Sequence, residues 1–139
     1  MTMKQAGSRE AFLRVDVDYV YAAVKWGKAA GVRRFVLVSS QGANEGSSSF
    51  YLRAKGRIER RVSELGFESL QIVRPPIILG ERFDTRPIEQ IAAAFFKLLP
   101  ACVFDKFRPL SGASIARAMI NAASSDACGV QIYEPREFL

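Results

Sequence analysis

The side chains best suited to chemistry in this sequence are a serine, a tyrosine and a lysine. Ser39 and Ser40 follow a short apolar run, Tyr51 comes eleven residues after Ser40, and Lys55 comes four residues after Tyr51. On a helix, Tyr51 and Lys55 would share one face, because residues at i and i+4 are neighbours on a helix surface. The short loop after Ser40 would return the helix to the end of the strand, so the three side chains can meet in one cleft.

A phenol beside an ammonium can move protons at neutral pH. A phenol with its ordinary pKa of about 10 is a poor acid–base catalyst there, and a neighbouring ammonium favours the phenolate form. A serine hydroxyl can hold a substrate carbonyl in line with the tyrosine proton. Ser40, Tyr51 and Lys55 therefore fit reversible hydride transfer between a nicotinamide cofactor and a small-molecule carbonyl or alcohol, with the cofactor supplying the hydride.

The Tyr-x-x-x-Lys spacing is weak evidence by itself. For Tyr51 and Lys55 alone, a half-buried tyrosine and an exposed lysine on an ordinary amphipathic helix is the more common interpretation. Two neighbouring features favour the chemical interpretation. The pair Ser39–Ser40 ends a buried strand at the required distance, and Arg74–Pro76 follows the next strand.

Hydrophobic periodicity predicts alternating helices and strands. The predicted helices cover Ser8–Ala30, Phe50–Leu65, Pro87–Pro100 and Ser111–Ser124, and the predicted strands cover Phe35–Val38, Leu70–Val73 and Gly129–Tyr133. The first two strands are apolar enough to be fully buried, and a helix joins them, so they form a parallel βαβ unit. The sequence predicts an α/β fold with a Rossmann-like doubly wound parallel sheet, which binds ligands at the carboxyl ends of its strands.

The first predicted helix has an apolar stripe that we expect to face the core. Its members recur at helical spacing and are Phe12, Val15, Tyr19, Ala23, Trp26 and Ala30. Ser8 is suited to cap its start, and Gly31 to end it.

Composition narrows the classes of function. The chain has 139 residues and no histidine, which excludes Ser-His-Asp catalysis and the usual zinc ligand sets. The net charge of +6 is compatible with nucleic-acid binding. The basic residues are scattered, however, and the denser run from Arg53 to Arg61 is typical of a solvated helix face. Cys102 and Cys128 are expected to be reduced and mostly buried. No apolar run is long enough for a membrane span or a signal peptide, so we expect a cytoplasmic protein.

These motifs resemble a known family. The stretch from Val15 to Ser40, the loop that follows it, and Ser47–Tyr51 with Lys55–Gly56 resemble the middle of extended and atypical short-chain dehydrogenases/reductases. Within that group they resemble the Tat-interactive-protein-like oxidoreductases and their bacterial relatives, described as nucleoside-diphosphate-sugar epimerase-like. It runs from Thr2 nearly to the C-terminus, as a single partial NAD(P)-binding domain over residues 1–139.

The resemblance implies roles for individual residues. Ser40, Tyr51 and Lys55 would be the catalytic residues, and Lys55 would also hydrogen-bond the nicotinamide ribose of NADP or NAD. The other cofactor-binding positions implied are Thr2, Ser39, Pro75, Pro76 and Ile77. The family's asparagine in the long helix matches Asp16 here, which puts a proton relay through this position in doubt. An aspartate there would simply cap or bend the helix.

One family feature is missing from the chain. No Gly-x-x-Gly-x-x-Gly turn, which receives the cofactor pyrophosphate at a helix N-terminus, occurs in the sequence. We therefore expect the C-terminal portion of a Rossmann-like fold that lacks the first strands, with an exposed sheet edge that a homodimer or a partner chain completes. The isolated chain is expected to bind NADP(H) weakly or not at all.

Two functions stay open from the sequence. The intact Ser40, Tyr51 and Lys55 favour an oxidoreductase or epimerase-like enzyme, while the missing turn favours a non-catalytic binding or regulatory module. Arg74 has two interpretations as well: it reaches a ligand phosphate or carboxylate, or, more commonly, it pairs with a carboxylate of the protein.

Overall fold

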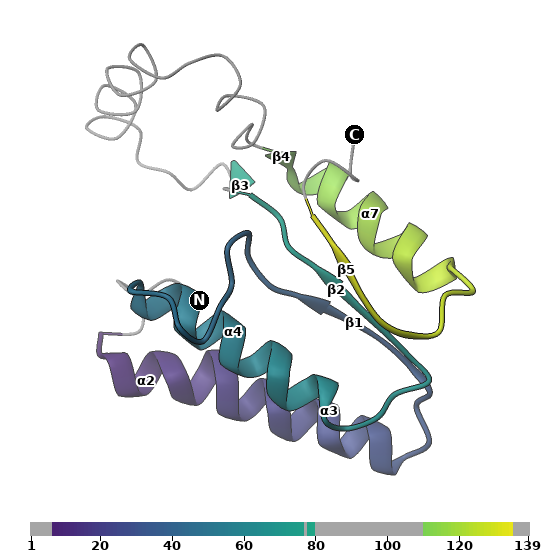
Figure 1. The fold of residues 1–139 in the computed structure, drawn as a ribbon, viewed down its shortest axis with the longest axis horizontal. Helices are drawn as coiled ribbons and strands as arrows, with labels where there is room; N and C mark the ends of the chain where they lie inside the picture. Colours follow the sequence, from purple (N-terminus) through teal and green to yellow (C-terminus); the bar gives the residue numbers. More distant parts are fainter. Residues whose placement is uncertain (1–6, 77, 80–109, 135–139) are drawn as a thin grey trace.

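The computed structural model describes residues 7–76, 78–79 and 110–134 (Figure 1). Its helical segments are α2 (Arg9–Leu13), the π-helix η1 (Arg14–Tyr19), α3 (Val20–Ala29), α4 (Phe50–Ser63) and α7 (Gly112–Ser124). Its strands are β1 (Arg34–Val38), β2 (Ser69–Val73), β3 (Ile78–Leu79), β4 (Leu110–Ser111) and β5 (Gly129–Tyr133). The predicted helix Pro87–Pro100 and Cys102 lie outside the described residues.

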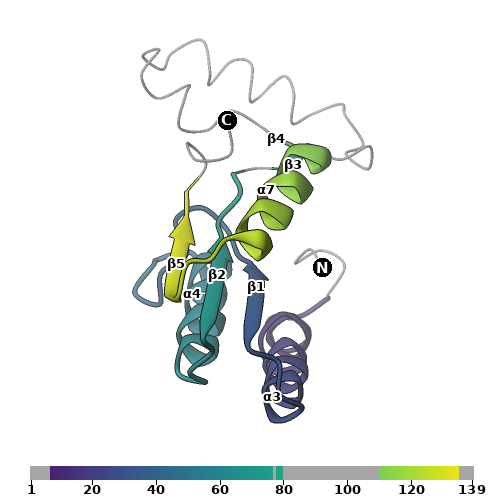
Figure 2. The same ribbon diagram turned by 90° about the vertical axis from the view of Figure 1, so that its right-hand side faces the viewer.

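A three-stranded parallel sheet with helices on both faces organises the described residues. The strand order is β1-β2-β5, with Leu37 of β1 opposite Ile72 of β2, and Ile72 opposite Ile132 of β5. The helices α3 and α4 lie side by side on one face, and α7 lies across the other (Figure 2). The strands β3 and β4 form a separate parallel pair. The predicted Rossmann-like α/β architecture is confirmed.

The two central strands differ in burial. Every residue of β2 is buried, as predicted for an inner strand. The prediction of full burial is wrong for β1, where Leu37 is buried, Phe35, Val36 and Val38 are half-buried, and Arg34 is exposed. The reason is that β1 has a single strand neighbour, β2, within the described residues.

The long N-terminal helix buries Phe12 as predicted, but from the segment η1 onward it buries a different face from the one predicted. Phe12, Val17 and Val24 are buried, whereas Tyr19 is 59% exposed and Trp26 is 74% exposed. The cause is the π-helical segment η1, because its wider turn adds a residue and shifts the register of all that follows. Phe12 and Val17 therefore share a face although they are five residues apart.

Local signals fix the helix ends. The Ser8 hydroxyl accepts a hydrogen bond from the Ala11 backbone N–H at 3.0 Å, and the Ser111 hydroxyl caps α7 in the same way at 3.1 Å. Gly31 follows α3 with a φ of 88° and Gly66 follows α4 with a φ of 67°. Both glycines adopt the left-handed conformation that ends helices.

Most of the basic run on α4 is engaged in contacts within the protein. Arg53 donates to the backbone carbonyls of Ser47 and Ser48 at 2.7 Å. Arg60 pairs with Glu45 and Glu64, which raises the pKa of its guanidinium. Arg61 pairs with Asp18 and lies over the Tyr21 ring. The expectation of a buried thiol is wrong for Cys128, which is exposed. No described helix is long and apolar enough to cross a membrane.

Candidate functional site

The carboxyl ends of β1 and β2 lie together, and the segments that follow them stay joined. The Ser39 N–H donates to the Val73 carbonyl at 2.8 Å, and the Gln41 N–H donates to the Pro75 carbonyl at 3.0 Å. Ser39 is only 5% exposed, and within the described residues its hydroxyl has no hydrogen-bond partner. Pro75 and Pro76 are also buried. This edge of the sheet therefore presents a buried polar atom, a feature that usually needs a partner.

The loop after Ser40 is held against the first half of α4. The Ala43 N–H donates to the Ser40 carbonyl at 3.0 Å, and the Asn44 N–H donates to the Leu52 carbonyl at 3.1 Å. Gly56 permits this contact, since a Cβ there would meet the Asn44 carbonyl carbon and the Glu45 nitrogen at 2.5 Å. The loop thus returns to the helix that carries Tyr51 and Lys55.

Tyr51 and Lys55 lie on one face of α4, as their spacing predicts. The Lys55 ammonium is 5.7 Å from the centroid of the Tyr51 ring. The Phe12 ring of α2 packs against the Phe50 and Tyr51 rings, and its centroid is 5.9 Å from the centroid of each. Tyr51 itself is 36% exposed, and the Phe12 ring contacts its ring.

Lys55 also contacts a residue that the sequence left without a clear role. Its Nζ donates to Asp16 Oδ1 at 2.8 Å, and the two side chains are 14% and 10% exposed. Asp16 lies within the π-helical segment η1. One signal could have revealed this pair: Asp16 follows Phe12 by four residues, so a carboxylate stands on the buried face of the helix.

A second cluster of charges surrounds Arg74. Its guanidinium binds both oxygens of Glu59, at 3.0 and 2.7 Å, and Glu134 at 3.0 Å. These carboxylates raise the pKa of Arg74, the hydrogen bond to Glu59 contributing most. Of the two interpretations of Arg74, pairing with a carboxylate of the protein is the one that the structure shows.

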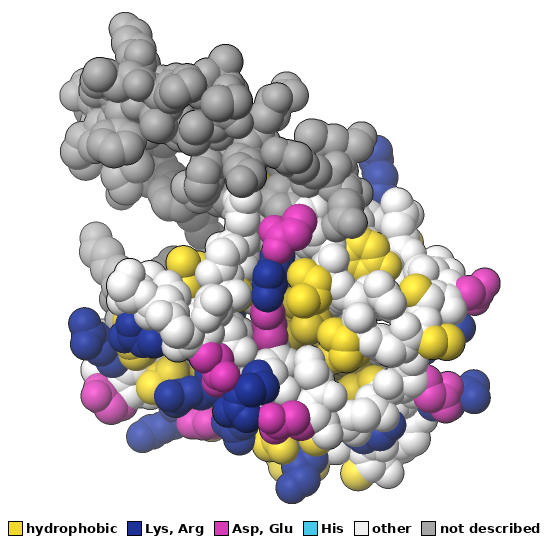
Figure 3. All heavy atoms as spheres, viewed as in Figure 1, with side chains coloured by type: hydrophobic (Ala, Val, Ile, Leu, Met, Phe, Trp, Pro, Cys, Tyr) yellow, Lys and Arg dark blue, Asp and Glu magenta, His cyan; other side chains and the backbone are white. Residues whose placement is uncertain are grey.

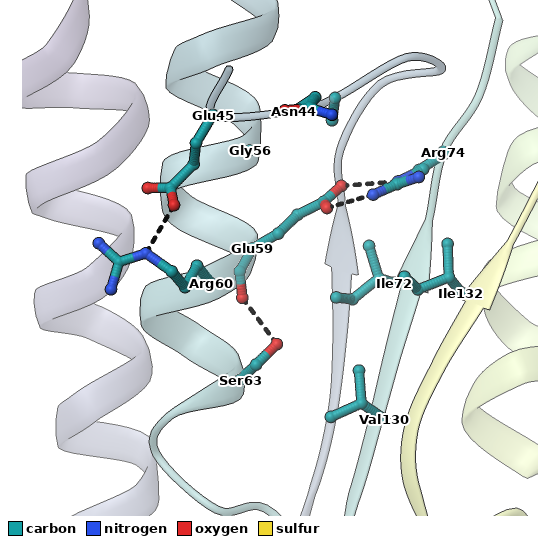
Figure 4. A pocket seen from close by; sticks show the side chains of 11 residues that line it. Asn44, Glu45, Gly56, Glu59, Arg60, Ser63, Ile72, Arg74, Val130 and Ile132 are labelled. Atoms are coloured by element: carbon teal, nitrogen blue, oxygen red, sulfur yellow. Dashed lines mark hydrogen bonds and ion pairs between the residues drawn. The ribbon is translucent and has the colours of Figure 1, made fainter. Parts of the chain in front are cut away.

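A hollow of about 460 Å³ opens beside this cluster, between α4 and the sheet. Ile72, Val130 and Ile132 line it on the sheet side (Figure 4). In Figure 3 hydrophobic side chains appear beside a column of acidic and basic ones. Neither Ser40 nor Tyr51 nor Lys55 lines this hollow, so it is separate from the candidate site.

The predicted site residues can now be located. Ser39, Ser40, Pro75 and Pro76 lie at the carboxyl ends of β1 and β2, and Tyr51 and Lys55 lie on α4. Thr2 and Ile77 lie outside the described residues.

The fold and the strand-end polar residues define the class: a Rossmann-like α/β protein. No protein-family model matches the sequence. The chain is 38% identical to protein HTATIP2 of Rattus norvegicus over 128 residues, 92% of this chain. It is also 38% identical to the mitochondrial protein FMP52-1 of Scheffersomyces stipitis over 143 residues, 98% of this chain. The chain is therefore homologous to the HTATIP2/FMP52 family, which confirms the resemblance seen in its motifs.

The relatives are longer than this chain. The matches cover 52% of the rat protein and 63% of the yeast protein. The chain thus spans about half to two thirds of these curated relatives, and the activity of a whole relative can be carried over only as a proposal.

Proposed function

We propose that this chain carries the catalytic face of an NAD(P)-dependent oxidoreductase of the short-chain dehydrogenase/reductase type, acting on a small carbonyl or alcohol. The observation that supports it most is the approach of the Lys55 ammonium to 5.7 Å from the Tyr51 ring on one face of α4. Homology to HTATIP2 over 92% of the chain adds to it.

The described residues fit one end of a nicotinamide cofactor. Ser39 offers a buried hydroxyl with no partner in the described part of the chain, at the edge where parallel sheets bind ligands. An ammonium has three hydrogens, so Lys55 can donate to Asp16 and still donate to the hydroxyls of a ribose. Pro75 and Pro76 would lie beside the nicotinamide amide. The sequence offers no Gly-rich turn for the pyrophosphate, so these residues fit only the nicotinamide end.

Each side chain has a distinct task in this proposal. The cofactor, when bound, would supply or accept the hydride. Tyr51 would give its phenolic proton to the carbonyl oxygen as the alcohol forms, and would take it back in the reverse direction. Ser40 would donate a hydrogen bond to the same oxygen and hold it in line with the phenol. Lys55 would stabilise the negative charge left on the phenolate.

Activity assays test the proposal. The chain is incubated with NADPH or NADH and a panel of aldehydes and ketones, and oxidation of the nicotinamide is the readout. We expect Tyr51→Phe to reduce turnover at least about a hundredfold, the usual effect of losing a general acid. Tyr19→Phe is the matched control, because Tyr19 is an exposed tyrosine of η1 outside the site. Measurable turnover of the parent chain that Tyr51→Phe leaves unchanged would contradict the assignment.

Cofactor affinity is a separate expectation. Without a Gly-rich turn, the chain should bind NADP(H) weakly or not at all in calorimetry. Micromolar affinity would show that the pyrophosphate turn is dispensable.

The second candidate is a non-catalytic binding or regulatory module. It is favoured by the missing turn and by the engagement of Lys55 with Asp16. Ligand binding without nicotinamide oxidation, in the parent and in Tyr51→Phe alike, would favour this module over the enzyme.

Partner and compartment are further proposals. We propose that a homodimer or a partner chain completes the sheet at β1, a strand with a single buried residue, Leu37. We also keep the cytoplasm as the proposed location, although FMP52-1 of Scheffersomyces stipitis carries the word mitochondrial in its name. Fractionation of cells that express the protein, probed with an antibody to this chain, would decide between the two compartments.

A further inference from the structure

Two apolar side chains of β5 lie uncovered in the hollow between α4 and the sheet. Val130 is 47% exposed and Ile132 is 44% exposed, although the strands of a parallel sheet are normally buried on both faces. Both side chains line the hollow beside Ile72 of β2 (Figure 4). Apolar side chains gathered in a concave place mark a surface that another group covers.

The chain leaves β5 at the rim of this hollow. Glu134 directly follows the strand, and its carboxylate accepts a hydrogen bond from the Arg74 guanidinium at 3.0 Å. Arg74 itself lines the hollow. The sequence continues with Pro-Arg-Glu-Phe-Leu at residues 135–139, which lie outside the described residues. The ion pair therefore fixes the point from which this segment departs.

The length and the apolar residues of the segment 135–139 suit the hollow. Phe138 comes four residues after Glu134, and Val130 comes four residues before it. Because each extended residue advances the chain by about 3.3 Å, a segment that reverses direction at Pro135 would bring Phe138 level with Val130. Proline is suited to such a turn, and Phe138 and Leu139 supply two large apolar groups.

The charges at the rim are complementary to the segment. Glu59 and Glu134 share the single guanidinium of Arg74, so this cluster carries one negative charge in excess. Arg136 follows Glu134 by two residues and carries a positive charge. Attraction between opposite charges favours a segment that stays close to the cluster.

The covalent link favours this segment over a second copy of the chain. A second copy would lose its translational and rotational freedom on docking. A segment tied to the rim by a few residues is present there at an effective concentration of about a millimolar or more. The same apolar contact is therefore more favourable within one chain than between two.

We propose that residues 135–139 fold back over the hollow and place Phe138 and Leu139 against Val130 and Ile132. The hollow is then a docking surface for the chain's own segment, and the ion pair of Glu134 with Arg74 is the hinge from which that segment returns. The proposal goes beyond the proposed function and does not depend on it.

Alkylation of a single introduced thiol by iodoacetamide tests whether the hollow is covered. The full chain carries Ile132→Cys, with Cys102 and Cys128 replaced by serine, and its rate is divided by the rate of the same variant in urea. The matched control is Val32→Cys, since Val32 is 41% exposed and Ile132 is 44% exposed. We expect the thiol of Ile132→Cys to react at least about tenfold more slowly than that of Val32→Cys, because it reacts only when the segment opens. Equal rates would overturn the proposal.

A second variant identifies the group that covers the hollow. Adding Phe138→Ser and Leu139→Ser to Ile132→Cys should raise its alkylation rate to that of Val32→Cys, at every protein concentration. A protection that these serines leave in place would overturn the proposal in favour of another occupant. If that protection grows with protein concentration, the occupant is a second copy of the chain.

Disulfide formation gives a readout that leaves β5 unchanged. Ser63 of α4 lines the hollow, so Ser63→Cys with Phe138→Cys should form an intramolecular disulfide in air, seen as a faster band on a non-reducing gel. Ser124→Cys with Phe138→Cys is the control, because Ser124 ends α7 on the other face of the sheet (Figure 2). Equal cross-linking of the two pairs would show a segment that does not dock in the hollow. Neither experiment uses nicotinamide, so its result is independent of the oxidoreductase assignment.

Discussion

Single residues at the candidate site are tied to one another by charge. Lys55 makes two contacts. Its ammonium forms an ion pair with the buried Asp16 carboxylate and also lies 5.7 Å from the centroid of the Tyr51 ring. Replacing one partner of a buried ion pair usually destabilises a protein more than replacing both partners by apolar residues. Stability measurements can therefore tell whether the pair exists in solution.

We predict that Lys55→Met lowers the free energy of unfolding by about 3–5 kcal/mol. The double variant Asp16→Leu/Lys55→Met should recover most of that loss, because both charges of the pair are removed together. Urea denaturation followed by circular dichroism measures both. Equal losses in the single and the double variant would contradict a buried pair.

Gly56 is the second residue on which the site geometry depends. A Cβ at this position would stand 2.5 Å from the backbone of Asn44 and Glu45, and backbone atoms cannot easily give way. We predict that Gly56→Ala destabilises the chain by about 1–3 kcal/mol, the usual cost of overpacking. Gly27→Ala is the control, since its Cβ would find only the Val32 side chain at 3.7 Å, and helix propensity favours alanine. A neutral Gly56→Ala would mean that the loop does not contact α4 this closely.

At the scale of elements, the π-helical segment explains where sequence reasoning failed. The strands β1, β2 and β5, the loop after Ser40, and the helices α4 and α7 were predictable because their periodicity is uninterrupted and their ends carry glycine or serine signals; the two-residue strands β3 and β4 are too short to leave such a pattern. The buried face of the first helix was not predictable, because hydrophobic periodicity assumes a constant number of residues per turn. The wide π-helical turn buries Val17 and Val24 in place of the predicted Tyr19 and Trp26.

The candidate site was predictable to a similar degree. The i, i+4 spacing of Tyr51 and Lys55 holds within one regular helix, so their shared face follows from sequence. The Asp16–Lys55 pair joins residues 39 positions apart on two elements, and local patterns do not report such contacts.

The helix register leads to a test with paired substitutions. We predict that Trp26→Lys changes the free energy of unfolding by no more than about 0.5 kcal/mol, as for most surface positions. Val24→Lys should cost more than about 3 kcal/mol, since Val24 is 3% exposed and a lysine there would bury a charge. Trp26 is the single tryptophan of the chain, so its emission should also be that of a solvated indole. The reverse order of the two stabilities would support an uninterrupted α-helix.

At the scale of the whole molecule, the central strand of the sheet and the two strands beside it differ in burial. β2 is buried along its whole length, while β1 and β5 flank it with exposed residues, among them Val130 and Ile132 of β5. The match to rat HTATIP2 covers 52% of that protein, so the other 48% of it has no counterpart in this chain. A parallel strand is normally buried on both faces and paired on both edges, so both β1 and β5 depart from their usual surroundings, because each has one strand neighbour within the described residues.

An open edge of this kind promotes pairing with another chain, and a lysine on the edge strand is the device by which natural proteins prevent it. We predict that the chain self-associates in solution and that Val36→Lys, on the half-buried β1, shifts it toward the monomer. Sedimentation velocity over a range of concentrations measures the change. Ile120→Lys is the matched control, because Ile120 is 65% exposed and lies on the helix α7 rather than on a strand. If the parent chain is monomeric at high concentration, or if both lysine variants dissociate it equally, β1 is not the edge at which the sheet is completed.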